Sequence, residues 1–306
     1  VVAARAGVAA VSAIGDEPFL ISQLVRLAGN AVAANAGLRV LAQAEVTDDA
    51  ALAAYQDALR AEADFPWLLT GLRGERAMFD KTFEGLENGT LGAKDLGELM
   101  DNRANPVLLG AGFQIYKGFL PGDRAMGLKL ISDAIDIAKR PHHEQKAAFK
   151  EWKKSWPFAD GDSFRYLITR LTMPAMEKVA DACVRGRATL LAASAAVACE
   201  RFRLARGRWP ESLDEIPPAI LPPLPPDPYT GRPLQFRRVS DGVLVFTDAD
   251  DLPKQREPNP GESRDPLEGV GRGFKLWNPE LRGVTRPAPE LPPDFFADPP
   301  GLEVPP

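Results

Sequence analysis

The chain is poor in the residues on which metal centres, redox sites and nucleophilic catalysis most often depend. Its 306 residues include two cysteines and two histidines. Cys183 and Cys199 fall sixteen positions apart in one predicted helix, so their Cα atoms would lie about 24 Å from each other. A disulfide needs Cα atoms within about 7 Å, so these two cysteines cannot form one without breaking the helix. We expect both to be small buried apolar residues, which indicate no particular redox compartment.

The two histidines indicate no catalytic site either. His142 and His143 follow Pro141 at a predicted helix start. Adjacent residues on a helix point about 100° apart, so they rarely bind one metal ion together. A zinc protease, a Ser-His-Asp triad or a Cys-His pair would have to use one of them, and no nucleophile elbow accompanies either. We expect a solvent-exposed helix start, and the sequence identifies no catalytic residue.

The sequence also lacks a basic excess and a long apolar run. The net charge is −5, with both signs interspersed, so no basic face for phosphates is visible and nucleic-acid binding is disfavoured. No run of about 20 apolar residues occurs, so no membrane span is predicted within the chain. Residues 1–14 are apolar but too short to span, and they contain Arg5. The chain starts at Val rather than Met, so membrane contact is expected only through a segment upstream of Val1.

Proline is abundant, and most of the 29 prolines fall at or after Pro217. They separate an Ala/Leu-rich helical body from a region of turns and short strands. In the body, apolar residues recur at helical spacing between capping and breaking residues. The predicted helices cover residues 1–14, 19–43, 50–63, 65–86, 124–139 and 141–152, with shorter pieces over 90–122. No period of 20 to 50 residues repeats, so residues 1–160 are predicted to be an all-helical domain, either a bundle or a stack of helical hairpins.

The second predicted domain, residues 161–280, begins after a candidate boundary at 153–162. A helix from Ser163 is expected to be interrupted or kinked at Pro174 and to continue over 175–205, with Gly207 as its stop. One short helical turn over 209–216 and an extended stretch over 217–228 follow. The sequence then predicts a hairpin with strands 233–239 and 243–247, and a third strand over 273–277. Residues 281–306 form a Pro-rich tail. The predicted fold is therefore mostly α with a small α+β C-terminal module, in which the long helix packs on a short antiparallel sheet.

An ordered set of motifs in this second domain resembles a known family. The run ARGRWPESL over 205–213 and the turn DPYTGRPL over 227–234 precede the hairpin. This order resembles the soluble domain of type II secretion pseudopilins, in which a long helix leads to a three-stranded antiparallel sheet. The resemblance covers under a third of the chain, and about 160 helical residues stand where that family has a methylated apolar helix behind a cleaved leader. The whole layout also resembles an uncharacterised group of bacterial envelope-associated proteins, which implies a periplasmic or cell-surface location.

The pseudopilin family also has a calcium loop before its last strand. Asp248, Asp250 and Asp251 stand in a comparable place, but the Gly-rich part of that loop is absent. The resemblance therefore implies a calcium site at these three carboxylates as a hypothesis, with a solvated acidic loop as the alternative. No other cofactor is predicted.

Three functions of different classes remain open. The first is a non-enzymatic envelope protein, structural or interacting with a protein partner. The second is a hydrolase that uses Glu75 and Asp80 in a groove between helices, because acid–base catalysis needs two such groups; the simpler interpretation of residues 73–81 is a solvated, salt-bridged helix face. The third is a helical-repeat adaptor whose C-terminal hairpin only caps the stack.

Overall fold

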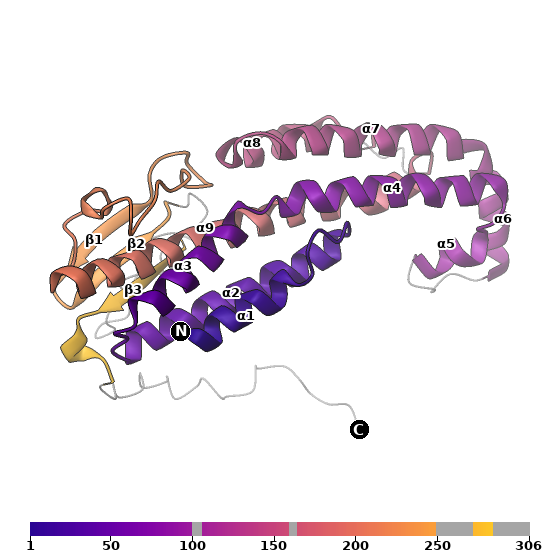
Figure 1. Cartoon of the computed structure of the whole chain (residues 1–306). Helices are drawn as coiled ribbons and strands as arrows, with labels where there is room; N and C mark the ends of the chain where they lie inside the picture. Colours follow the sequence, from indigo (N-terminus) through magenta and orange to yellow (C-terminus); the bar gives the residue numbers. More distant parts are fainter. Residues whose placement is uncertain (100–105, 159–163, 249–271, 284–306) are drawn as a thin grey trace, which may run out of the picture.

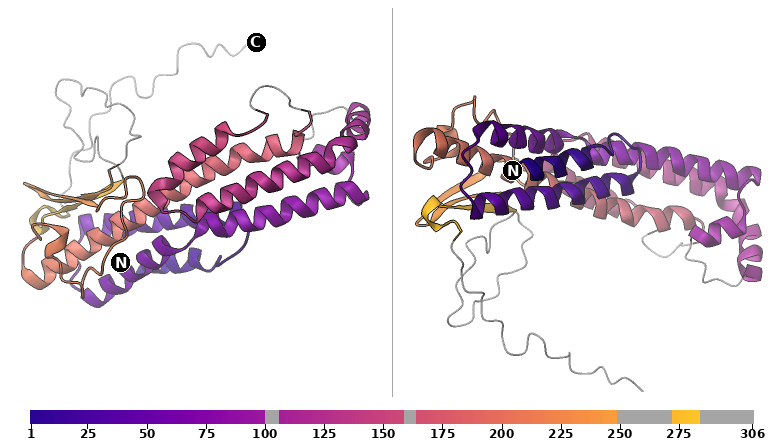
Figure 2. Two further views of the ribbon diagram at one scale, coloured as in Figure 1. Left: turned by 90° about the horizontal axis from the view of Figure 1, so that it is seen from above. Right: turned by 60° about the horizontal axis from the view of Figure 1, so that its bottom comes forward.

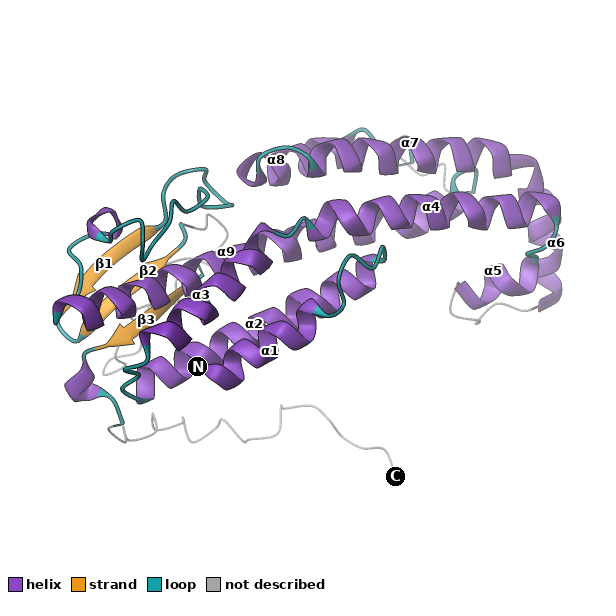
Figure 3. Ribbon diagram, viewed as in Figure 1, coloured by secondary structure: helices purple, strands orange, loops and turns teal. Residues whose placement is uncertain are grey.

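The computed structural model describes residues 1–99, 106–158, 164–248 and 272–283, and it confirms a mostly helical fold with one small antiparallel sheet (Figures 1 and 3). The helices described are α1 (Val2–Ser12), α2 (Leu20–Gln43), α3 (Asp49–Asp64), α4 (Trp67–Asn88), α5 (Ala93–Leu99), α6 (Pro106–Tyr116), α7 (Leu120–Ala138), α8 (His142–Lys154) and α9 (Leu167–Arg206). The strands are β1 (Gln235–Val239), β2 (Gly242–Phe246) and β3 (Gly273–Trp277), and the single-turn 3₁₀ helices are η1 (Lys117–Phe119), η2 (Leu213–Glu215) and η3 (Pro279–Leu281).

Helix α9 is the central element of the molecule. Its 40 residues make a rod about 60 Å long. Helices α2, α3, α4, α7 and α8 all pack on it, as do strands β2 and β3 (Figure 2). In a solenoid each hairpin contacts only its neighbours, whereas here the helices share one central partner. The sheet lies at the C-terminal end of α9, and α5 and α6 lie at the opposite end of the molecule (Figure 1).

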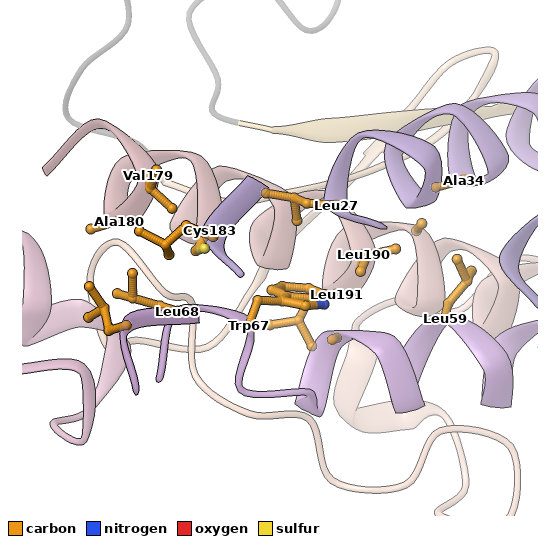
Figure 4. Close-up of a cluster of buried hydrophobic side chains, with 14 of the residues drawn as sticks. Leu27, Ala34, Leu59, Trp67, Leu68, Val179, Ala180, Cys183, Leu190 and Leu191 are labelled. Atoms are coloured by element: carbon orange, nitrogen blue, oxygen red, sulfur yellow. The ribbon is translucent and has the colours of Figure 1, made fainter. Parts of the chain in front are cut away.

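The alanine-rich part of α9 is buried on every side. All residues from Leu190 to Glu200 are buried. A helix with an amphipathic pattern can be covered on one face only, whereas a run of alanines allows several neighbours to approach at once. Leu190 and Leu191 lie in a cluster with Leu59 of α3 and Trp67 of α4 (Figure 4). A Cβ atom at Gly186 would lie 1.9 Å from Leu27 Cδ1, so this glycine lets α2 approach α9 closely.

One described helix, α9, has a composition like that of a membrane-spanning helix, and its burial in the core explains this composition. Among the described helices, α9 alone is long and apolar enough to cross a membrane, but 78% of its most apolar window is buried inside the protein. The side chains that give α9 this composition therefore face other parts of the chain, as in the core helix of a folded domain.

Two helix starts differ by four residues from the sequence-based prediction. Helix α9 begins at Leu167, not at Ser163, and it continues through Pro174 without interruption. Its first turn is capped from another helix, because the buried carboxylate of Asp123 accepts hydrogen bonds from the N–H groups of Ile168 and Thr169 at 2.9 and 3.2 Å. Helix α7 begins at Leu120 rather than at residue 124, since Pro121 fits its first turn.

The three-stranded sheet confirms the predicted strands. The order is β1-β2-β3, with both pairs antiparallel and a two-residue turn at Ser240 and Asp241. All five residues of β2 are buried. The stretch 217–228 begins with a turn, in which Ile220 and Leu221 donate to the Pro217 carbonyl, and residues 222–227 have no regular secondary structure. The expected helical turn is confined to Leu213–Glu215.

One hydrophobic core joins the elements on both sides of the predicted boundary at 153–162. Helices α7 and α8 pack on α9, and α9 packs on the sheet. Elements of both predicted domains thus pack on α9, and the division into two domains stays a prediction.

Candidate functional site: an open sheet edge beside a proline-lined groove

The hydrogen-bonding pattern of the sheet fixes which main-chain groups of β1 face outward. In an antiparallel pair, alternate residues bond to a given neighbour. Thr247 donates to the Arg272 carbonyl and Asn278 to the Asp241 carbonyl, each at 2.9 Å, so odd-numbered positions of the β2 strand bond to β3. Even-numbered positions of β2 therefore bond to odd-numbered positions of β1. The N–H and C=O groups of Phe236 and Arg238 consequently point away from β2.

The opposite edge, at β3, is covered at its Trp277 end. Arg282 donates from Nε to the Trp277 carbonyl at 3.0 Å and forms two 2.7 Å hydrogen bonds with the buried carboxylate of Glu200. Glu200 also accepts from Arg203, and the Trp209 indole donates to Asn278 at 2.8 Å. Strand β3 further packs on α2 and α9. A buried charge network thus covers the Trp277 end of this edge, and β3 also packs on two helices.

The β1 edge has no such cover in the described part of the chain. Among the described residues, no hydrogen bond engages the outward N–H and C=O groups of Phe236 or Arg238. A groove of about 740 Å³ lies beside this edge instead. Its lining is mostly proline and leucine and comes from the 211–226 segment and the start of β1: Leu213, Ile216, Pro218, Leu221, Pro222, Pro223, Leu224, Pro225, Pro226, Pro233, Leu234 and Phe236.

The wall of this groove is held in place by contacts with the helices and within the 227–232 turn. The Ile220 carbonyl accepts hydrogen bonds from Gln56 of α3 and from Arg201 of α9. In the turn, the buried Asp227 carboxylate accepts the N–H groups of Tyr229 and Asp248 at 2.9 and 2.7 Å. Burial raises the pKa of Asp227, and these two hydrogen bonds oppose the shift. Since proline also fixes φ, the groove is formed before any ligand arrives.

Charges are confined to the rim of the groove. Glu211 pairs with the exposed Arg238 side chain across the edge. Asp214 is exposed and makes no ion pair within the described ranges. The site therefore combines outward main-chain donors and acceptors, an apolar floor and one unpaired carboxylate.

The predicted calcium ligands are tested only in part. Asp248 follows β2, donates its N–H to Asp227, and pairs its carboxylate with Arg232 at 2.8 Å. Asp250 and Asp251 lie outside the described residues. Within those residues no three His, Cys, Asp or Glu side chains gather as a metal site would require. Calcium binding at Asp248, Asp250 and Asp251 stays a prediction.

Glu75 and Asp80, the predicted hydrolase pair, form hydrogen bonds with different helices. Glu75 accepts the N–H of Leu20 at 3.1 Å and so caps the start of α2. Asp80 accepts two hydrogen bonds from Arg124 of α7, at 2.9 and 2.7 Å. Within the helix Lys81 pairs with Glu84, which lies just beyond the stretch 73–81. The hydrogen bonds of Glu75, Arg76 and Asp80 reach across to α2 and α7.

The two histidines also differ from each other. The ring of His142 is half-buried against a small cavity lined by Trp67, Cys183 and Arg187, and burial lowers its pKa to about 4. The expected exposure is therefore wrong for His142. His143 is exposed and lines an open groove of about 780 Å³ between α7 and α8. Acidic residues of that groove pair with nearby lysines, which is typical of a solvated helix face.

No family model matches this chain, and neither a curated protein nor a solved structure is significantly similar to it.

Sequence reasoning did not single out Phe236, Arg238 or Asp214. The sequence signals that could have pointed to this site were the Asp-Gly hairpin and the nearby proline run over 222–226. Neither reveals which side of β1 is free, because that depends on the pairing of β2 with β3, thirty residues further along the chain.

Proposed function

We propose that this chain is a non-enzymatic cell-envelope protein that binds an extended segment of a protein partner along β1. The observation that supports it is the pair of outward-facing residues, Phe236 and Arg238, beside a preformed apolar groove. An extended peptide that joins an open sheet edge gains affinity from main-chain hydrogen bonds and specificity from pockets for alternate side chains.

The groove chemistry defines the class of peptide. Its apolar floor favours apolar side chains at alternate positions of the bound segment. The unpaired carboxylate of Asp214 on the rim favours a lysine or arginine near one end. Two outward residues offer four main-chain hydrogen bonds at about 1 kcal/mol each, so burial of apolar side chains must supply the rest of the affinity. We expect dissociation constants in the micromolar range.

The envelope location rests on the resemblance of residues 205–234 to type II secretion pseudopilins. The resemblance implies a long helix packed on a three-stranded antiparallel sheet, and α9 with strands β1 to β3 has this arrangement. Trp209 and Asp227, two residues of the shared motifs, hold the sheet end of the molecule together. Cell fractionation of the full-length protein tests the location: recovery from the cytoplasm alone would contradict it.

Peptide binding is tested with two variants of one residue. A panel of fluorescein-labelled twelve-residue peptides, with valine or leucine at alternate positions and one terminal lysine, is titrated with the protein, and anisotropy is measured. Arg238→Pro removes the outward N–H and leaves a peptide carbonyl without a donor, so it should weaken binding by about 1 to 3 kcal/mol, whereas Arg238→Ala keeps the N–H and should bind nearly as well as the wild type. Matched peptides with proline at alternate positions should not bind.

Hydrogen exchange gives a second readout. The amides of Phe236 and Arg238 should exchange rapidly in the free protein and slowly with a bound peptide, while the ladder amide of Arg237 should be protected in both. Equal binding by wild type and Arg238→Pro, or no binding by any member of the panel, would refute the proposed site.

A further inference from the structure

The outer face of α2 is apolar where a surface helix normally carries charge. Ile21, Val25, Ala28, Val32 and Ala36 recur at helical spacing and are all exposed, with Val32 at 71% and Ile21 at 68%. We call these five residues the α2 stripe. The opposite face of α2 packs on α9 and α4. Helices α1 and α2 form the outer layer on this side of the molecule (Figure 2). A helix face of this composition is expected to have a partner.

Charges of opposite sign lie at the two ends of the α2 stripe. Asp16 and Glu17 precede the helix, and Arg39 extends the stripe near its C-terminus. All three are exposed, and none makes an ion pair within the described segments. Glu17 precedes Ala28 by eleven residues and Arg39 follows Ala28 by eleven. Ala28, the centre of the stripe, is thus also midway between these two charges in the sequence.

We propose that two copies of this chain associate through the α2 stripe, antiparallel, about a two-fold axis near Ala28. This arrangement brings the basic end of each stripe, at Arg39, toward the acidic end of the other, at Asp16 and Glu17. It also makes the contact isologous, so the same surface serves both copies and the assembly closes as a dimer. A parallel arrangement would instead bring like charges together.

The composition of the stripe favours a second copy over a lipid surface. Helices that lie on membranes are rich in lysine and arginine on their polar side. Here Arg39 is the only basic residue of the exposed face of α2, and two carboxylates lie at the other end. Small side chains such as Ala28 and Ala36 allow two helices to approach to about 8 Å between their axes.

The size of the stripe predicts a weak dimer. The 24 residues of α2 make a helix about 36 Å long. A contact about 10 Å wide along it buries roughly 360 Å² per copy, less than the roughly 800 Å² of a standard interface. We therefore expect a dimer with a micromolar dissociation constant, monomeric at nanomolar concentration.

A cysteine at the axis tests the geometry directly. Ala28→Cys should form a disulfide-linked dimer under mild oxidation, since Cα atoms across the axis would lie within the about 7 Å that a disulfide needs. The matched control is Ala147→Cys, on an exposed position of α8, which should remain monomeric. Cys183 and Cys199 are buried and should not react.

Charge exchange tests the register. Sedimentation velocity at about 1 to 200 μM should show a concentration-dependent dimer, and Val32→Glu should abolish it. Glu17→Arg and Arg39→Glu should each raise the dissociation constant about tenfold, and the double variant should restore it. These positions lie outside the β1 groove, so peptide binding should be unchanged.

Three results would overturn the proposal. The first is a wild-type monomer at 200 μM, and the second is equal cross-linking of Ala28→Cys and Ala147→Cys. The third is binding to vesicles of neutral and anionic phospholipid that Val32→Glu abolishes, which would identify a lipid surface as the occupant.

Discussion

At the β3 edge of the sheet Arg282 and Glu200 cover the end of the strand, whereas at the β1 edge the main-chain groups of Phe236 and Arg238 point outward and Phe236 lines a groove. The Arg282 and Glu200 side chains are 2% and 0% exposed. The Arg238 and Glu211 side chains, which pair at the open edge, are 45% and 65% exposed. A buried charge left alone is very costly, while an exposed pair contributes little. The same residue types therefore hold the fold together at one edge and leave the other available for a ligand.

The largest effect is expected when the closed edge is broken. Arg282→Ala leaves the buried Glu200 carboxylate with Arg203 as its remaining partner and frees the Trp277 carbonyl. We expect the free energy of unfolding to fall by about 3 to 5 kcal/mol, measured by urea denaturation. The matched change at the open edge, Arg238→Ala, should cost about 0 to 1 kcal/mol. Equal costs would show that the two edges do not differ in this way.

The sequence predicted the elements of this contrast but not the contrast itself. The strand over 273–277 and the hairpin were correct because alternation and the Asp-Gly turn are local signals. The motif residue Trp209 came from the resemblance, and its role at the closed edge depends on Asn278, nearly seventy residues away. In the sequence, Glu200 is one of several polar residues near a helix end. Its burial results from long-range packing, which the local sequence does not reveal.

Long-range contacts also explain the errors in the helical body. Helix α9 starts at Leu167 because Asp123 of α7 caps it, and a cap from another element leaves no local sequence signal. Glu75 and Asp80 were plausible catalytic carboxylates as a pair on one helix, but each faces a different neighbour. Spacing predicts which helix face a residue occupies, whereas the partner of that face is decided by the tertiary fold.

Proline substitution on β1 tests the direction of its main-chain groups. Arg237→Pro removes an N–H that bonds to Leu244, a buried residue, and leaves that carbonyl without its donor. Arg238→Pro removes an N–H that points away from β2 and takes no part in the ladder. We expect Arg237→Pro to be less stable than Arg238→Pro by about 1 to 3 kcal/mol in urea denaturation. The reverse order would mean that the outward residues of β1 are wrongly assigned.

The closed edge should also respond to pH. Burial alone would raise the pKa of the Glu200 carboxyl, but hydrogen bonds from Arg282 and Arg203 outweigh it and hold the pKa below its usual value. A carboxyl whose pKa is lower in the folded state stabilises the fold above its unfolded pKa of about 4.5, and this contribution is lost as the pH falls through the folded pKa.

The stability difference between wild type and Glu200→Gln should therefore narrow as the pH is lowered from 7 into the acid range below 4.5. Glu211→Gln, at the exposed pair of the open edge, serves as the control and should follow the wild-type profile closely. Urea denaturation at each pH measures both. A constant difference between wild type and Glu200→Gln would show that this carboxyl is not stabilised by its charge.

The smallest effect concerns Asp214, whose carboxylate is exposed on the rim of the groove. Asp214→Asn should leave the unfolding free energy unchanged within about 0.5 kcal/mol, because exposed charges without a partner contribute little to the fold. It should weaken binding of a lysine-containing peptide about two- to fivefold at low salt, and added salt should reduce this difference, since exposed ion pairs are screened. A matched peptide with glutamine in place of lysine should bind both proteins equally. If Asp214→Asn changes stability and not peptide affinity, the rim carboxylate belongs to the fold, and the open edge is less different from the closed one than the structure suggests.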